Sequence, residues 1–137
     1  MYISSSLRQA VAQNSLYRCG YCLTSELIVG SEFTVDHIIP QSLGGPTSVE
    51  NLCLAYWGCN LHKHDRLVAL DPDTDILVRL FHPNQQRWQD NFAWFEKGLL
   101  IVGMTPTDRA TIQALQLNRP PLSNLANYGF RQVGIRQ

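Results

Sequence analysis

Four cysteines constrain the fold of this 137-residue chain more than any other feature of its sequence. Cys19 and Cys22 are separated only by a glycine and a tyrosine, a segment too short and too turn-prone for a regular helix or strand. We expect a knuckle, a tight turn that directs two thiolates at one metal ion. Cys53 and Cys59 lie well downstream, and in a cytosolic protein this arrangement favours a metal site over disulfides.

The bulk composition is that of an ordinary globular protein, with 45% hydrophobic and 16% charged residues. The length fits one domain, or a small module with an extension packed onto it. No apolar run approaches the roughly 18 residues that a membrane span needs, and the first six residues lack the basic and apolar segments of a secretory signal. We therefore expect an intracellular, cytoplasmic protein with no membrane partner. Nothing in the sequence indicates its oligomeric state.

The charge distribution is nearly balanced, with a formal net charge of +0. This balance is an argument against a nucleic-acid partner, because phosphate binding usually requires a basic surface. Residues 1–70 carry four basic and five acidic residues, whereas residues 104–137 carry four arginines and one aspartate. Any electrostatic contact with nucleic acid is therefore expected at the C-terminal end.

Periodicity, caps and breakers predict an α+β fold built from short elements. In the first half we expect a helix over 4–14, a strand over 33–39, a returning strand over 51–55 and a short helix over 59–66. In the second half we expect strands over 76–81, 87–95 and 99–104, then two helices. The first of these begins after a Thr105 cap and ends at Pro120, and the last covers 122–132. We divide the chain into a core, 1–70, and a C-terminal extension, 71–137, packed on that core.

Asp36 and His37 stand side by side at the end of the predicted strand over 33–39. Side chains alternate along a strand, so the two reach one site only at a bulge or at the strand's end. A carboxylate can hold a divalent ion through hard oxygen, and a neutral imidazole can take a proton from water near pH 7. Alone, the pair is weak evidence, since most such dipeptides lie on surfaces or cap turns.

The surrounding motifs strengthen this interpretation. In order, they are the Cys19–Cys22 knuckle, the run Asp36-His37-Ile38-Ile39-Pro40, the Gly44-Gly45 loop, Asn51-Leu52, and Cys59-Asn60 with Lys63 beyond. Together they resemble the HNH endonuclease family and its ββα-metal core, over about residues 18–66. The C-terminal half resembles the extension of small bacterial HNH proteins, which is common in cyanobacteria. In that half, the aromatic stripe of Trp88, Phe92 and Trp94 is expected to be core.

The resemblance implies a role for each matching residue. His37 would be the general base that activates water, and Asp36 and Asn60 would be the protein ligands of Mg²⁺ or another divalent ion. Asn51 would orient the histidine and help to fix the loop. The substrate implied is nucleic acid, DNA in the first instance.

Two basic residues extend this interpretation towards substrate binding. Lys63, one turn beyond Asn60, is either a phosphate contact or a solvated surface charge, and Arg66 is a second candidate nucleic-acid contact.

The sequence departs from the family at the structural zinc site. That zinc usually takes two Cys-x-x-Cys pairs; Cys59 ends the second pair, but Tyr56 occupies the position of its first cysteine. His62 or Cys53 would supply the missing ligand. A third alternative is that no complete Zn²⁺ site exists and that packing of Tyr21, Tyr56 and Trp57 replaces it.

Two classes of function remain open from the sequence. The first is a metal-dependent endonuclease that cleaves phosphodiester bonds. The second is a non-catalytic, zinc-knuckle-like module that binds nucleic acid or a protein. The Tyr56 substitution and the neutral charge favour the second class, and the presence of Asp36, His37, Asn51 and Asn60 favours the first. A toxin or defence effector would share the chemistry of the first class.

Overall fold

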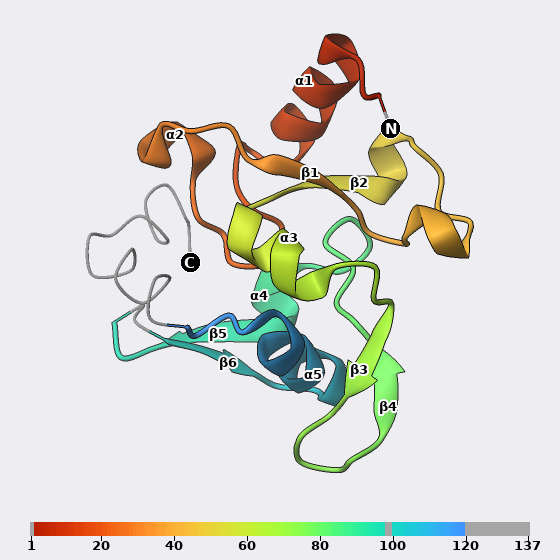
Figure 1. The fold of residues 1–137 in the computed structure, drawn as a ribbon. Coiled ribbons are helices and arrows are strands. Elements are labelled where there is room, and N and C mark those ends of the chain that lie inside the picture. The colour runs from red at the N-terminus through yellow and green to blue at the C-terminus, as the bar shows by residue number, and fades with distance from the viewer. Residues whose placement is uncertain (1, 98–99, 120–137) are drawn as a thin grey trace.

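The computed structural model describes residues 2–97 and 100–119 (Figure 1). It contains the helices α1 (Ser5–Asn14), α2 (Glu26–Val29), α3 (Trp57–Lys63), α4 (Trp88–Asn91) and α5 (Pro106–Leu115). The strands are β1 (Thr34–His37), β2 (Leu52–Ala55), β3 (Val68–Leu70), β4 (Leu77–Arg79), β5 (Phe92–Phe95) and β6 (Leu100–Gly103). Two 3₁₀ turns, Gln41–Leu43 and Val49–Asn51, lie between β1 and β2. The strands form three antiparallel pairs, β1–β2, β3–β4 and β5–β6, so the α+β class is confirmed.

The first strand pair and the helix that follows it form a ββα unit. The register of β1 and β2 places Asp36 opposite Cys53 and His37 opposite Leu52. Helix α3 packs on both strands and, on its other side, on α5. In Figure 1, α3 therefore lies between the β1–β2 pair above and α5 with the β5–β6 pair below.

Local sequence explains the two long helices. Ser4 caps α1 by accepting a hydrogen bond from the Leu7 amide, and Val11 and Ala12 on its inner face are buried. Thr105 and Asp108 form a capping box at the start of α5, as its sequence predicts. Helix α5 ends at Leu115, before the prolines that were expected to stop it. The helix predicted over 122–132 lies outside the described residues.

The second half differs from the prediction in two places. Residues 88–91 form the short helix α4 instead of the first half of a long strand over 87–95. The reason is that Trp88 and Phe92 stack at a spacing of four residues, with ring centroids 5.2 Å apart, which is a helical spacing. Strand β3 was not predicted; it pairs with β4 across an acidic turn, residues 71–76. The predicted division at residue 70 stays a prediction, and it falls inside this hairpin.

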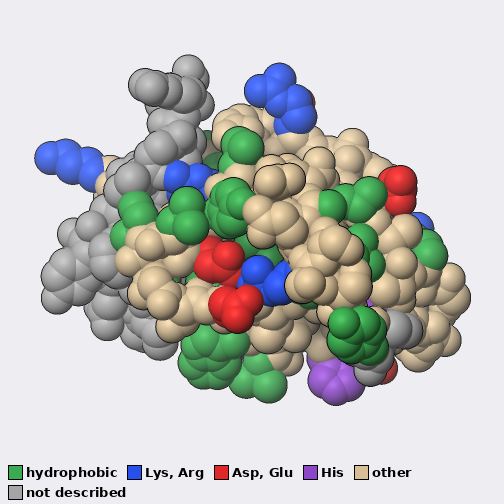
Figure 2. Space-filling model, turned by 90° about the horizontal axis from the view of Figure 1, so that it is seen from above, with side chains coloured by type: hydrophobic (Ala, Val, Ile, Leu, Met, Phe, Trp, Pro, Cys, Tyr) green, Lys and Arg blue, Asp and Glu red, His purple; other side chains and the backbone are tan. Residues whose placement is uncertain are grey.

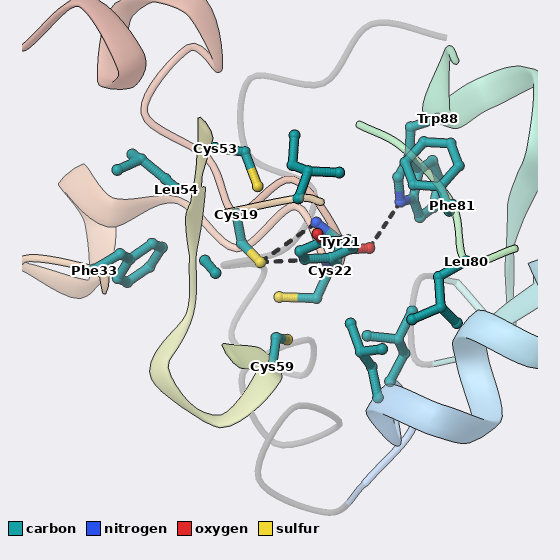
Figure 3. Close-up of a cluster of buried hydrophobic side chains, with 14 of the residues drawn as sticks. Cys19, Tyr21, Cys22, Phe33, Cys53, Leu54, Cys59, Leu80, Phe81 and Trp88 are labelled. Atoms are coloured by element: carbon teal, nitrogen blue, oxygen red, sulfur yellow. Dashed lines mark hydrogen bonds between the residues drawn. The ribbon is translucent and has the colours of Figure 1, made fainter. Parts of the chain in front are cut away.

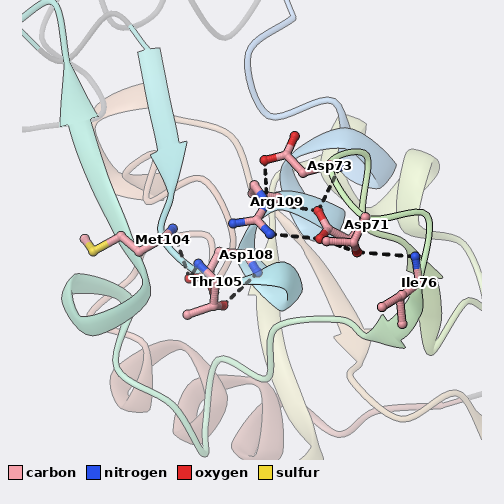
Figure 4. A network of polar contacts seen from close by, with 8 residues as sticks. Asp71, Asp73, Ile76, Met104, Thr105, Asp108 and Arg109 are labelled. Atoms are coloured by element: carbon pink, nitrogen blue, oxygen red, sulfur yellow. Dashed lines mark hydrogen bonds and ion pairs between the residues drawn. The ribbon is translucent and has the colours of Figure 1, made fainter.

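A polar network fastens the β3–β4 turn to α5 (Figure 4). The guanidinium of Arg109 donates to both carboxylate oxygens of Asp71, at 2.9 and 2.8 Å, and forms an ion pair with Asp73 at 3.0 Å. Asp71 is fully buried and also accepts a hydrogen bond from the Thr74 hydroxyl at 2.7 Å. The acidic turn therefore faces a guanidinium from α5.

Within the described residues, one apolar cluster joins the two halves of the chain. Trp88 and Phe92 are buried in it, as the sequence predicts, and the Trp88 ring also stacks on that of Trp94. The indole N–H of Trp88 donates to the carbonyl of Tyr21 at 2.9 Å, which joins the extension directly to the knuckle (Figure 3). Among the described helices, none is long and apolar enough to cross a membrane.

Candidate active site

The end of β1, the turn after Pro40 and helix α3 enclose an open groove of about 370 Å³. The lining residues that carry chemistry come from two places in the sequence: Asp36, His37, Asn60, His64 and Asp65. The structure therefore brings together the predicted acid, base and amide. Asp36 and His37 both reach the groove because His37 is the last residue of its strand.

Asp36 is buried and compensated inside the protein. Its side chain is 4% exposed and accepts a hydrogen bond from the Tyr21 hydroxyl at 2.7 Å. The ammonium of Lys63 lies 3.2 Å from the same carboxylate oxygen and 3.3 Å from the other. Burial raises the pKa of Asp36, while the charge of Lys63 and the Tyr21 hydrogen bond act in the opposite direction. Burial also keeps the pKa of Tyr21 well above its usual range, so the phenol remains a donor.

Lys63 is not the exposed charge that was considered from the sequence. It is 1% exposed, and its ammonium also donates to the His37 carbonyl at 3.1 Å. The ammonium of Lys63 is therefore bound to groups of the protein itself, and in this conformation it does not point towards a phosphate. Arg66, the other predicted contact, is exposed but donates to the carbonyls of His62 and Ala114, at 2.6 and 2.8 Å. It ties α3 to α5.

The imidazole of His37 is half-buried and held by Thr47. Its Nε2 lies 2.9 Å from the Thr47 hydroxyl. Partial burial lowers the pKa of His37, although the charge of Asp36 opposes this effect. A histidine whose pKa lies below 6.5 is mostly neutral at pH 7, which is the form that accepts a proton.

Asn51 fixes the loop from which Thr47 extends. Its carboxamide oxygen accepts from the Ile39 amide at 2.9 Å, and its nitrogen donates to the carbonyls of Ile39 and Pro46 at 3.0 and 2.9 Å. Gly45 allows this close approach, because a Cβ there would collide with the Ile39 carbonyl oxygen. The contacts of Asn51 thus fix the loop, and the side chain that meets the imidazole is Thr47.

Three cysteines meet behind the groove. The sulfur atoms of Cys19, Cys22 and Cys59 lie within 4.8 Å of one another and are directed into one space (Figure 3). All three side chains are fully buried. Burial raises the pKa of Cys19 to about 12. Burial alone would also raise the pKa of Cys22, but hydrogen bonds from the neighbouring thiols and from Thr24 outweigh it and hold that pKa well below its usual value.

Neither predicted fourth ligand belongs to this group. Over the described residues, His62 and Cys53 lie outside the set of sulfur atoms that converge, and no other His, Cys, Asp or Glu joins it. Cys59 and Lys63 are among the buried residues of α3, whereas His62, which lies between them in the sequence, is not. Residues 120–137 contain no Cys, His, Asp or Glu at all.

Arg119 lies against the edge of the cluster instead. Its guanidinium donates to the Cys59 sulfur at 3.6 Å and lies 6.0 Å from the centre of the Tyr56 ring. The Tyr56 ring in turn packs edge-to-face on Phe33 at 5.5 Å. The position of the missing cysteine is therefore filled by an aromatic ring and an arginine.

Comparison with protein families assigns this region. Residues 19–66 match the family model described as HNH endonuclease. The chain contains an HNH endonuclease domain. No curated protein and no solved structure matches the chain. The matched HNH segment begins at Cys19 and ends at Arg66, so it includes the groove and the three cysteines.

The HNH domain offers donors for two kinds of metal ion. The Asp36 carboxylate and the Asn60 amide line one groove and are the hard oxygen donors that Mg²⁺ or a similar ion prefers. The three converging thiols are soft donors that fit three of the four positions of a tetrahedral zinc ion. The domain thus separates an oxygen-lined groove from a sulfur-lined interior.

Sequence reasoning missed three neighbours of the site. Tyr21 is inside the knuckle motif, but its distance of 15 residues from Asp36 conceals the hydrogen bond between them. Thr47 follows the Gly-Gly loop, and its position between His37 and Asn51 was an available signal. His64 is the residue that directly follows α3, and it lines the groove together with Asn60.

Proposed function

We propose that this chain is a metal-dependent endonuclease that hydrolyses phosphodiester bonds in nucleic acid, and specifically in DNA. The observation that supports this proposal is the convergence of Asp36, His37 and Asn60 on one groove within an HNH domain. The cytoplasmic location expected from the sequence stays a prediction.

Each groove residue has a distinct part in the proposed reaction. Neutral His37 takes a proton from the attacking water, and Thr47 holds its ring in place. Asp36 and Asn60 would hold Mg²⁺ or a related ion, with Lys63 and Tyr21 fixing the carboxylate. The ion would supply compensation for the negative charge that develops on the phosphate and the leaving oxygen.

We further propose that the three-cysteine cluster holds a structural zinc ion. Zinc would cross-link the knuckle to the start of α3, and so set the distance between the Asp36 strand and Asn60. It would take no part in the hydrolysis itself.

A second candidate is a binding module without catalysis. The incomplete cysteine set and the neutral net charge favour it. A module of this kind would not need a neutral histidine positioned next to a carboxylate and an amide, so the groove favours the enzyme.

Cleavage assays on the full chain separate the two candidates. Supercoiled plasmid and single-stranded oligonucleotides are incubated with Mg²⁺ or Mn²⁺, with and without EDTA. We expect ion-dependent cutting that falls at least 100-fold in His37→Ala, the lower end of what a general base contributes. His62→Ala, which changes a histidine outside the groove, serves as the matched control and keeps full activity. If the native chain never cuts above the His37→Ala background, the enzyme proposal fails and the binding module stands.

A further inference from the structure

Helix α3 presents two large apolar side chains to solvent. Trp57 and Leu61 lie one turn apart, and each is 62% exposed. The opposite face of the same helix is buried through Cys59 and Lys63. The exposed pair is therefore not needed for the packing of α3 against the core.

The same exposed face leads into the catalytic groove. Asn60 lines that groove, and with Trp57 and Leu61 it follows the i, i+3 and i+4 spacing of one helix face. The Tyr56 ring lies next to the Trp57 indole, with 6.1 Å between the ring centroids. Trp57 and Leu61 do not line the groove, but one precedes Asn60 by a helical turn and the other follows it directly, so both flank the groove at Asn60.

The groove offers little attraction for phosphate by charge. Its described lining contains Asp36 and Asp65 but no Lys or Arg, and the nearby Lys63 is paired with Asp36. On the face of the molecule shown in Figure 2, the Lys and Arg side chains are scattered and do not form a patch. With no basic side chain in the described lining, contacts with bases would add affinity to that of a divalent ion, and stacking on an exposed aromatic ring is a sequence-tolerant way to obtain it.

We propose that Trp57 and Leu61 form a stacking platform for an unpaired base next to the scissile phosphate. The HNH domain then prefers single-stranded or locally unpaired nucleic acid over a continuous duplex, whose bases are already stacked on each other. The proposal rests on the proposed function, because it is the nuclease groove that places a nucleic-acid strand beside α3.

The first test measures binding, not cleavage. The full chain carrying His37→Ala is mixed with a single-stranded DNA oligonucleotide and with the matched duplex, at one fixed salt concentration, and each Kd is measured by fluorescence anisotropy. We expect tighter binding of the single strand. Adding Trp57→Ala weakens that binding roughly 5- to 150-fold, the range expected for loss of one stacking ring, and leaves the Kd of the duplex unchanged.

Matched variants distinguish stacking from general loss of apolar surface. Trp57→Phe keeps a ring and retains most of the affinity, and Leu61→Ala has a smaller effect than Trp57→Ala. Leu27→Ala on α2 removes a side chain that is 70% exposed elsewhere, and it leaves both Kd values unchanged. Trp57 is the most exposed of the three tryptophans, because Trp88 is buried and Trp94 is partly buried. We therefore expect single-stranded DNA to quench mainly the fluorescence of Trp57, and this quenching to be lost in Trp57→Phe.

Three results would overturn the platform. The first is an unchanged single-strand Kd in Trp57→Ala, and the second is equal affinity of the native chain for single strand and duplex. The third is a dimer in sedimentation that Trp57→Ala dissociates, which would make this face a contact between copies of the chain. A native chain that binds single strands through Trp57 but never cleaves would leave the platform standing and remove the nuclease proposal.

Discussion

The negative charge of the Asp36 carboxylate is compensated inside the protein, by the Lys63 ammonium and by a hydrogen bond from the Tyr21 hydroxyl. The sequence placed Lys63 one turn beyond Asn60 but gave no indication of which side of α3 faces β1. A lysine that is 1% exposed is rare unless it is paired, so both alternatives considered from the sequence, a phosphate contact and a solvated charge, placed this side chain at the surface. The candidates Asp36, His37 and Asn60 came from a local motif, whereas their supporting contacts span 10 to 27 residues and depend on the fold.

Replacing Lys63 tests the buried ion pair. Lys63→Met removes the positive charge and leaves the Asp36 carboxylate buried without a cation, so we expect a loss of about 3–5 kcal/mol in the free energy of unfolding. Urea denaturation followed by circular dichroism measures it. Asp36→Asn combined with Lys63→Met recovers a large part of the loss, because neither charge remains. Lys97→Met removes an exposed lysine and stays within about 0.5 kcal/mol of the native chain. Equal stability of Lys63→Met and Lys97→Met would contradict the pairing.

The elements that the sequence predicted best are those with strong end signals. Helices α1 and α5 have capping side chains, and β1 ends close to a proline, so their positions were predicted to within a few residues. Strand β3 has three residues, too few for a period of two to be recognised. Helix α4 was missed because its aromatic residue also fits a strand pattern with the two aromatics that follow it.

The link between the β3–β4 turn and α5 should depend on acidity. Contact with Arg109 holds the pKa of Asp71 well below its ordinary value, so ionised Asp71 stabilises the folded state at neutral pH. This stabilisation is fully present above the unfolded pKa of about 4 and declines as the pH falls through lower values. Urea unfolding of the native chain and of Asp71→Asn is compared at pH 7, 5, 4 and 3. The stability difference is expected to be constant from pH 7 to 5 and to shrink below pH 4.

An Arg109→Gln background provides the control for this titration. The guanidinium is absent there, so the Asp71→Asn effect is smaller at pH 7 and varies less with pH. The Thr74 hydroxyl remains as a partner of Asp71 in both backgrounds. A pH dependence that is identical with and without Arg109 would show that the ion pair is not its source.

At the scale of the whole molecule, the three-cysteine cluster lies where both halves of the chain meet. Cys19 and Cys22 precede β1, Cys59 belongs to α3, and Arg119 reaches the cluster from beyond α5. No local pattern announces a contact between residues 60 positions apart, which explains why Arg119 was not predicted. The Tyr56 substitution was visible in the sequence, but the side chain that compensates for it was not.

Zinc content tests the role of this cluster. Elemental analysis of the purified chain should give about one zinc per chain, and Cys22→Ala should lose it. Cys53→Ala, which removes a buried thiol outside the cluster, should keep the metal while losing some stability. A strong chelator should lower the Tm of the native chain but leave that of Cys22→Ala unchanged. Absence of zinc from the native chain, or its retention in Cys22→Ala, would show that the three thiols are not a zinc site.

The hydrogen bond from the Trp88 indole to the Tyr21 carbonyl has a consequence for dissecting the protein. The hydroxyl of the same tyrosine holds Asp36, so a residue of the extension and the acid of the groove share one scaffold. A gene cut after residue 70 would also split the β3–β4 hairpin and remove Trp88 from Tyr21. A portable HNH domain taken from this chain therefore has to extend at least through Arg119, well past the end of the HNH match.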